Sequence, residues 1–260
     1  MTCCQMRVID AAIKGSSVAA VIPTMDVNQT RVRRLASELD STGVDVLFVE
    51  DSGPSFRFAR SMNAGIKALL TRPHIRYILL SNDDICEIRG FDDMLGALRE
   101  GKGSYAQPYV NGDRPSFVVT DSLPRLMVNY GIRKRAPFYA LRLSKAARIH
   151  GGSKKPIIFS PAVLRRKEII SVQPFGLFDR KVLECEIFDE NFHNGVEDIE
   201  LAYRLHLRGF GGLTDVRWSI SHAKGESFRL HNTRTGAGSY YGDDRQMGEN
   251  WGYFNRKYGR

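Results

Sequence analysis

The sequence predicts an α/β fold with a central, mostly parallel sheet flanked by helices. Short apolar runs alternate with stretches of helical periodicity through the first hundred residues. The chain has 260 residues, of which 42% are hydrophobic and 26% charged, which is an ordinary globular composition with enough apolar side chains for a large core. One α/β domain can absorb this length, so we expect a single domain.

The first third of the chain has the order strand, helix, strand, helix, strand. Residues 18–22, 44–49 and 77–80 are apolar runs, and the first of them stops at Pro23. Between the runs, apolar residues recur at helical spacing. They are Val32, Leu35 and Leu39 in one stretch and Phe58, Met62, Ile66, Leu69 and Leu70 in the next. This order predicts a parallel sheet with right-handed crossovers.

Polar residues follow each of these three strands. Ligands of parallel sheets bind outside the carboxyl ends of the strands, so a binding crevice is expected there. Polar turns are also common at strand ends, and spacing alone leaves both interpretations open. The residues concerned are Thr24 and Asp26, Glu50 and Asp51, and Asn82, Asp83 and Asp84.

The rest of the chain gives further helix and strand signals. Met94, Leu95 and Leu98 indicate a short helix. Residues 136–147 have a helical stripe flanked by basic residues, which fits either a surface helix or a contact with an anionic membrane. Residues 175–178 are apolar, and Asp179 is a candidate N-cap for a helix through Leu183.

A second helix is expected over residues 198–208 and a strand over residues 212–221. Gly209 is placed to end the helix, and His222 follows the strand. The predicted helix face consists of Ile199, Ala202, Tyr203 and His206. The tail from Ala223 onward is rich in Gly, Ser, Arg and Asn.

The charge, the cysteines and the absence of long apolar runs indicate the partners and the cellular compartment to expect. The net charge of +9 and the sequence pI of about 9.5 suit anionic partners, although a solvated basic surface explains them equally well. The four cysteines lack zinc spacing and are read as reduced thiols. No apolar run reaches the roughly 20 residues that span a bilayer, and no signal-peptide pattern is present. We expect a cytoplasmic protein, with peripheral contact at the inner face of the membrane left open.

Two acidic segments and one histidine could provide chemistry. Asn82-Asp83-Asp84 offers carboxylates that could bind Mg²⁺ or Mn²⁺, although an Asp-Asp pair is more often a solvated turn. Glu197-Asp198 lies at a predicted helix start, where the alternatives are an N-terminal cap and a general base. His222 is either structural or a ligand.

Several segments, in order along the chain, resemble family 2 glycosyltransferases with the GT-A fold, of the rhamnosyltransferase-like kind. FDENFHNGVEDIELAYRLHLRGF, residues 188–210, is similar to the family's F-D-E…E-D-x-x-L…R…G-[FY] signature. The other matches are AAVIPT (19–24), VEDSG (49–53), ARSMNAGI (59–66), ILLSNDD (78–84), ISH (220–222) and NWGYFNRKY (250–258). Two positions depart from the family pattern. Glu50 replaces the commoner Asp, and Asn82 replaces the first Asp of the metal turn.

The resemblance implies an inverting, divalent-metal-dependent hexosyltransferase that uses a nucleoside-diphosphate sugar. Asp84 and His222 would hold Mn²⁺ or Mg²⁺ on the diphosphate. Asp198 would be the general base, with Glu197 as the adjacent candidate for that role or for binding the acceptor. The nucleotide-sugar would lie against Pro23, Thr24, Glu50, Asp51, Asn63, Asn82 and Asp83.

The resemblance also implies an organisation of the chain. Residues 1–222 would form the transferase domain, with acceptor contacts in residues 103–173, and residues 223–260 a tail packed on it. Lys224, Arg229 and Arg234 would close over the diphosphate as a lid, or belong to a disordered basic tail. The expected donor is linked to UDP, dTDP or GDP, and the acceptor is a glycan or a lipid-linked glycan. The oligomeric state stays open.

Three other functions fit part of the sequence less well. A nucleotidyltransferase of the same fold would need a Gly-rich phosphate loop after the first strand, where Met25-Asp26-Val27-Asn28 stands instead. A non-catalytic basic module for anionic ligands fits the charge, but no nucleic-acid motif is present and no nucleic acid is expected as a partner. An inactive relative of the family would be expected to have lost Glu197-Asp198 or His222, and all three are intact.

Overall fold

Three parallel strands form the centre of the main sheet, in the order that the sequence predicts. The structure is a computed structural model, and it describes residues 6–51, 56–120, 128–129, 166–172, 174–223 and 244–258. Within it, β2 (Val18–Thr24) lies between β3 (Asp45–Glu50) and β4 (Tyr77–Ser81) and is parallel to both. Every residue of β2 and β3 is buried, as is typical of strands covered on both faces. The predicted α/β class is confirmed.

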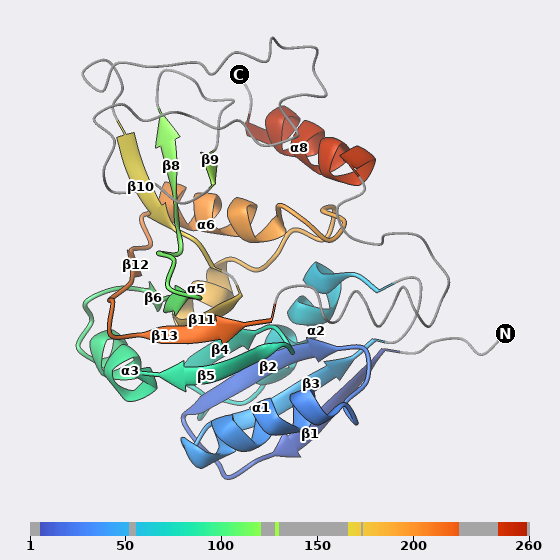
Figure 1. The fold of residues 1–260 in the computed structure, drawn as a ribbon, viewed down its shortest axis with the longest axis vertical. Coiled ribbons are helices and arrows are strands. Elements are labelled where there is room, and N and C mark those ends of the chain that lie inside the picture. The colour runs from blue at the N-terminus through green and yellow to red at the C-terminus, as the bar shows by residue number, and fades with distance from the viewer. Residues whose placement is uncertain are drawn as a thin grey trace, which may run out of the picture.

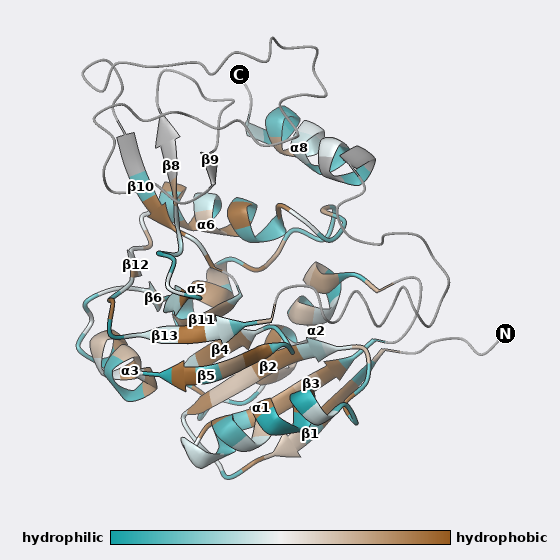
Figure 2. Cartoon of the chain, viewed as in Figure 1, coloured by the Kyte–Doolittle hydropathy of each residue, from teal (hydrophilic) through white to brown (hydrophobic). Residues whose placement is uncertain are grey.

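Helices cover both faces of this sheet (Figure 1). Ala19 and Val21 of β2 pack with α2, α5 and α6, whereas Ala20 and Ile22 pack with α1 and α3 on the other face. Because successive side chains of a strand point to opposite faces, one apolar run supplies both core layers. Figure 2 shows the apolar residues concentrated on the central strands and polar residues along α1. The helices are α1 (Thr30–Ser41), α2 (Phe58–Leu70), α3 (Phe91–Arg99), α5 (Arg180–Cys185) and α6 (Glu197–Leu207).

Antiparallel strands extend the sheet beyond the predicted parallel part. The main sheet has seven strands in the order β1-β3-β2-β4-β11-β6-β12. In it β1 pairs antiparallel with β3 and β11 antiparallel with β4, while β12 pairs parallel with β6. The strands not yet placed are β1 (Arg7–Ala12), β6 (Tyr105–Ala106), β11 (Phe175–Asp179) and β12 (Gly212–Leu213). The sheet is therefore mixed at its sides and parallel at its centre.

Two three-stranded sheets complete the strands of the described residues. Their orders are β5-β13-β7 and β10-β8-β9. The expected strand over residues 212–221 is wrong, because β12 and β13 belong to different sheets. Asp215 accepts hydrogen bonds from the backbone and side chain of Arg217, which forms a turn between them. The bounds are β5 (Ile85–Arg89), β7 (Tyr109–Val110), β8 (Ser116–Thr120), β9 (Val128–Asn129), β10 (Arg166–Ile170) and β13 (Ser219–His222).

A glycine allows α2 to approach the sheet closely. A Cβ atom added at Gly65 would overlap Val21 and lie 2.9 Å from Val49, both of them strand residues of the core. Any side chain at this position would force the helix away from β2 and β3. The glycine in the middle of this helix is thus explained by packing, although glycine costs helix stability.

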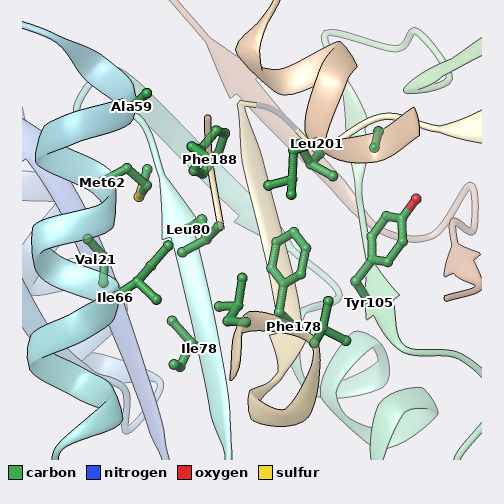
Figure 3. Close-up of a cluster of buried hydrophobic side chains, with 14 of the residues drawn as sticks. Val21, Ala59, Met62, Ile66, Ile78, Leu80, Tyr105, Phe178, Phe188 and Leu201 are labelled. Atoms are coloured by element: carbon green, nitrogen blue, oxygen red, sulfur yellow. The ribbon is translucent and has the colours of Figure 1, made fainter. Parts of the chain in front are cut away.

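The cluster in Figure 3 joins the sheet to α6. Tyr105 of β6 stacks on Phe178 of β11, with ring centroids 5.3 Å apart, and Leu201 of α6 lies against them. Val21, Leu80 and Ile66 continue the same buried layer toward α2. Leu201 is fully buried, which fixes α6 to the sheet along its length.

The ends of α5 and α6 follow the expected rules. Asp179 caps α5 by accepting a hydrogen bond from the N–H of Lys181 at 2.9 Å, as predicted. Gly209 has φ +81° and ends α6, also as predicted. The predicted apolar face of α6 is only partly right, since Tyr203 is half-buried and Glu200 is fully buried.

The C-terminal segment contains a helix that the sequence analysis missed. α8 (Asp244–Tyr258) packs on α6, with Phe254 and Tyr258 against the ring of Tyr203. The expected basic helix over residues 136–147 lies outside the described residues. No helix in the described part of the chain is both long and apolar enough to cross a membrane.

Candidate active site

The carboxyl end of the central strands gathers predicted site residues from distant segments. The Thr24 hydroxyl at the end of β2 donates a hydrogen bond to Oδ2 of Asp83 at 2.8 Å. Arg31, in the first turn of α1, approaches the same oxygen at 3.4 Å. Thr24 and Asp83 are both buried, so this contact fixes the turn after β4 against the end of β2.

The next carboxylate of that turn faces the predicted histidine. Nε2 of His222 lies 2.9 Å from Oδ1 of Asp84, and the amide of Asn82 lies 3.4 Å from the same ring nitrogen. Asn111 fixes the backbone of His222 through two hydrogen bonds, of 2.8 and 2.9 Å. The backbone N–H of Ala223 donates to the carbonyl of Asp84 at 3.1 Å. The structure therefore brings Asn82, Asp84 and His222 together.

The end of β3 supplies the remaining residues of this edge. Asp51 is buried, and its Oδ2 accepts hydrogen bonds from Ser61 at 3.0 Å and from Arg60 at 2.9 Å. Glu50 is buried beside the guanidinium of Arg7 and accepts a hydrogen bond from the N–H of Val27. Pro23 lies in β2, one residue before Thr24, and is buried in the sheet. We refer below to Thr24, Asp51, Asn82, Asp83, Asp84 and His222 as the strand-end cluster.

Asp84 and His222 are spaced as two ligands of one divalent cation would be. Ligand atoms about 2.1 Å from a common ion and at right angles to each other are about 3.0 Å apart, close to the observed 2.9 Å. Among the described residues, none donates a hydrogen bond of good geometry to Oδ1 of Asp84. The described residues contain no group of three or more metal-binding side chains. Two protein ligands are nevertheless sufficient where substrate phosphates and water complete the shell.

Asn63 is placed differently from the other predicted binding residues. It is buried in α2, and its side chain binds the backbone of Phe188 through two hydrogen bonds, of 2.8 and 3.0 Å. A third hydrogen bond, of 2.9 Å, joins it to Glu190. The side-chain amide of Asn63 therefore ties α2 to the segment that leads into α6.

The acidic pair stands at the N-terminus of α6, as the sequence predicts. Glu197 is buried, and its Oε2 accepts a hydrogen bond from the N–H of Gly195, whereas Asp198 is half-buried. Asn194 has φ +49° and Val196 has φ +75° in the turn that precedes the helix. A β-branched residue in this region costs about 1–3 kcal/mol, so the surrounding contacts must hold the turn in place.

Burial and mutual repulsion change the proton affinity of the pair. Burial raises the pKa of Glu197 to about 8, and the neighbouring charge of Asp198 adds to the rise, while the N–H of Gly195 opposes it. Burial raises the pKa of Asp198 as well, against the backbone N–H groups of the helix start. Both carboxyl groups therefore have a raised affinity for a proton, and Asp198 is the more accessible of the two.

A continuous set of contacts links the acidic pair to the strand-end cluster. Asn194 accepts a hydrogen bond from the N–H of Phe58 at 2.8 Å and donates one to the carbonyl of Phe56 at 3.0 Å. Phe58 begins α2, whose Ser61 binds Asp51. The turn before α6 is thus anchored to the helix whose first turn also supports the strand-end cluster.

The sequence analysis missed three polar residues near these groups. Asn194 and Asn250 hold the turn before Glu197, and the Asn194-Gly195 dipeptide is a turn signal that could have found the first of them. Gln107 is fully buried, and neither polar atom of its amide has a hydrogen-bond partner in the part of the chain that the structure describes. It lies over Gly176, whose strand neighbour Phe175 pairs with Ser81 just before the Asn82 turn. Nothing in the local sequence indicates that this glutamine is buried.

Three predicted lid residues lie outside the described residues, namely Lys224, Arg229 and Arg234. The expected acceptor segment of residues 103–173 is described only at residues 103–120, 128–129 and 166–172. The described part of that segment contains β6 to β10.

Comparisons with known proteins give low similarities. No protein-family model matches the sequence, and no curated protein matches it. Among solved structures, a STIV protein has TM-score 0.44 and 11% identity, covering 79% of this chain and 84% of its own. A glycosyltransferase involved in glycosylation of the major capsid of PBCV-1 has TM-score 0.42 and 8% identity, with coverage of 84% and 97%. A 4-diphosphocytidyl-2C-methyl-D-erythritol synthase from Anaerococcus prevotii has TM-score 0.38 and 10% identity, with coverage of 86% and 100%. At such scores the likeness decides nothing about activity, which depends on the residues of the site.

Proposed function

We propose that the chain is an inverting glycosyltransferase of the GT-A kind, transferring a hexosyl group from a nucleoside-diphosphate sugar to a hydroxyl of a glycan or lipid-linked glycan. The main support is the meeting of Asp84 and His222 at 2.9 Å, beside the Thr24–Asp83 contact, at the carboxyl end of parallel strands. Ligands of such sheets bind at this edge. The basic net charge of +9 also suits an anionic donor.

The donor would bind along the strand-end cluster. Thr24, Glu50 and Asp51 end two adjacent parallel strands, and Asp83 is fixed against them. Carboxylates at such positions accept hydrogen bonds from ribose or sugar hydroxyl groups. Their own contacts to Arg31, Arg60 and Ser61 keep them in place before a ligand arrives.

Asp84 and His222 would hold Mn²⁺ or Mg²⁺ on the diphosphate. The ion would offset the negative charge that builds up on the departing nucleoside diphosphate. The side chain of Asn111 binds the backbone of His222 and keeps that residue in place. The ring of His222 can therefore face Asp84 without a bound ligand. The lid role of Lys224, Arg229 and Arg234 stays part of this proposal.

Asp198 would act as the general base. The acceptor oxygen forms a bond to the anomeric carbon, the bond from that carbon to the diphosphate oxygen breaks, and the hydroxyl proton moves to Asp198. Asp198 is half-buried and accessible, whereas Glu197 is buried and bonded to Gly195. The pKa values of Glu197 and Asp198 are both raised by burial, which increases the proton affinity that a general base needs.

Thermal unfolding with nucleotides tests the donor site. We expect one of UDP, GDP, dTDP and CDP to raise the melting temperature in the presence of Mn²⁺, and EDTA to remove most of the effect. Ligand at a hundredfold excess over Kd stabilises the native state by about 2.7 kcal/mol. For a chain of this size that is roughly 5–10 °C.

Asp84→Asn and Asp113→Asn form a matched pair for this experiment. Asp113 is an exposed residue in the turn after β7, and its contact with Val110 is made by the backbone, which the substitution leaves intact. We expect Asp84→Asn to lose the Mn²⁺-dependent part of the shift and Asp113→Asn to keep it. The donor site is disproved if no nucleotide stabilises the protein, and the metal role is disproved if both variants respond alike.

A further inference from the structure

The turn before α6 has a backbone conformation that it cannot hold alone. Asn194 (φ +49°), Gly195 (φ +152°) and Val196 (φ +75°) all have positive φ values. For a β-branched residue such as Val196 this is a rare and strained conformation. The turn leads directly into Glu197 and Asp198, so its shape decides where the acidic pair points.

One side chain from α8 binds the backbone of this turn. The amide of Asn250 is buried, with 3% of the residue exposed. Its Oδ1 accepts the N–H of His193 at 3.1 Å, and its Nδ2 donates to the carbonyls of His193 at 3.0 Å and Gly195 at 2.9 Å. A single amide thus satisfies three backbone groups around Asn194.

The bond to Gly195 connects Asn250 with the acidic pair. The carbonyl of Gly195 accepts from Asn250, and the N–H of Gly195 donates to the carboxyl group of Glu197. The orientation of this glycine therefore depends on α8 on one side and holds Glu197 on the other. Asn194 fixes the opposite side of the turn to the start of α2.

We propose that Asn250 is a positioning residue that sets the geometry of the Glu197–Asp198 pair for the transfer reaction. This inference rests on the catalytic role proposed above for the pair. α8 contributes no residue to the strand-end cluster or to the acidic pair. In this proposal it nevertheless controls the position of the proton-accepting side chain.

The rest of α8 is attached to the protein independently of Asn250. Lys257 forms ion pairs with Asp189 at 2.7 Å and with Glu200 at 2.8 Å, and the hydroxyl of Tyr258 also binds Glu200. Phe254 is buried against Tyr203. We therefore expect that a substitution of Asn250 leaves the helix in place and loosens the turn alone.

Three variants of Asn250 and one matched control test the structural part. Asn250→Asp keeps the size and the acceptor but turns an oxygen toward two carbonyls, Asn250→Ala removes all three bonds, and Asn250→Ser retains one polar atom. Asn255→Asp makes the same chemical change on the same helix, at a half-buried position for which no hydrogen bond or ion pair is described. The readout is hydrogen exchange of the protein without ligand.

We expect the amides of residues 193–198 to exchange at least about tenfold faster in Asn250→Asp and Asn250→Ala. Asn250→Ser should be intermediate, and residues 251–258 and the Asn255→Asp protein should match wild type. Unchanged exchange at residues 193–198 would overturn the proposal. The serine variant keeps the test valid if the aspartate variant does not fold, since a smaller local increase is expected there.

Hydrolysis of UDP-glucose, GDP-mannose or dTDP-rhamnose distinguishes a role of Asn250 in positioning the acidic pair from a role in stability alone. For whichever donor is hydrolysed, we expect kcat to fall at least about tenfold in Asn250→Ala, with the Kd of the matching nucleoside diphosphate within about twofold of wild type. Faster exchange with unchanged kcat would overturn the role in positioning. If wild type hydrolyses none of the three, the transferase activity toward these donors fails, while hydrogen exchange still decides whether Asn250 holds the turn.

Discussion

The strand-end cluster and the Glu197–Asp198 pair both contain carboxylates, but the residues around those carboxylates differ. In the strand-end cluster, Asp83 contacts the guanidinium of Arg31 and the hydroxyl of Thr24, and Asp84 faces the ring of His222. At the start of α6, Glu197 is buried with Asp198 as its charged neighbour and backbone N–H groups as its donors.

This difference indicates different chemical tasks. Carboxylates held by neighbouring side chains are fixed in position, which suits binding of hydroxyl groups and a divalent ion. Two adjacent carboxyl groups removed from water gain affinity for a proton, which suits a group that must accept one during a reaction. The predictions below test this division of roles.

The largest expected effect is on turnover. Asp198→Asn should lower the rate of sugar transfer by about 10²–10⁴-fold, because it removes the proton acceptor. The affinity for the nucleoside diphosphate should stay within about tenfold, as measured by calorimetry. Asp83→Asn should do the reverse and weaken nucleotide binding more than the chemical step. If Asp198→Asn loses nucleotide affinity instead, Asp198 binds the nucleotide and is not the general base.

The second prediction concerns stability as a function of pH. The folded-state pKa of Glu197, about 8, is above its ordinary value of 4.5, so the native state binds a proton that the unfolded chain has released. The stabilising contribution is therefore present below about pH 4.5 and is lost as pH rises toward 8. We expect a decline on the order of a few kcal/mol in the free energy of unfolding, measured with urea at intervals across this range.

Glu197→Gln isolates that contribution, since its side chain has no charge to lose. The free energy of unfolding of this variant should depend less on pH between 4.5 and 8 than that of wild type. Equal slopes for wild type and Glu197→Gln would show that Glu197 is ionised in the native state.

The pKa of Asp189 is shifted in the opposite direction, so this residue affects stability at a lower pH. Its hydrogen bonds to Lys257, Tyr253 and Asn191 lower its pKa to about 2 despite burial, so its contribution is lost only in acid.

The third prediction tests whether Asn63 contributes to donor binding or only to the stability of the fold. Asn63→Ala should lower the free energy of unfolding by about 2–4 kcal/mol, because the N–H and carbonyl of Phe188 lose their partners inside the protein. Nucleotide affinity below the melting temperature should be unchanged if the residue only joins α2 to the segment before α6. A large loss of affinity would restore it to the donor-binding set.

The smallest effect is expected at Gln107. The amide is fully buried and has no hydrogen-bond partner among the residues that the structure describes, and an apolar side chain of similar shape removes the cost of burying it. Gln107→Met should therefore raise the free energy of unfolding by about 1–3 kcal/mol, seen as a higher urea midpoint. A lower midpoint would mean that the amide is satisfied in solution, for example by a buried water.

The parallel centre of the sheet could be predicted because its signals are local. The apolar runs and helical spacing place β2, β3, β4, α1 and α2 to within about two residues, and Asp179 and Gly209 mark helix ends. The strand over residues 212–221 failed because the Asp215–Arg217 turn interrupts it and sends its two halves to different sheets. The edge strand β1 has an exposed, mixed pattern that indicates nothing by itself.

The site was predictable in its types of residue and only partly in its geometry. The resemblance named Asp84, His222 and the acidic pair, and the structure brings the first two into contact. The contributions of Asn194 and Asn250 depend on contacts between distant segments, which no local pattern reveals. α8 was missed for the same reason, since its glycine- and asparagine-containing sequence is a weak helix signal without α6 beside it.

The buried Glu200 bears on the order in which the protein matures on the ribosome. Its carboxylate has no exposed surface and is bound by Arg204 of its own helix and by Lys257 and Tyr258 of α8. A nascent chain that has emerged only through β13 possesses the main sheet, His222 and the acidic pair but lacks two of these three partners. The strand-end cluster can therefore assemble while translation continues, whereas the surroundings of α6 are completed only after α8 has been made.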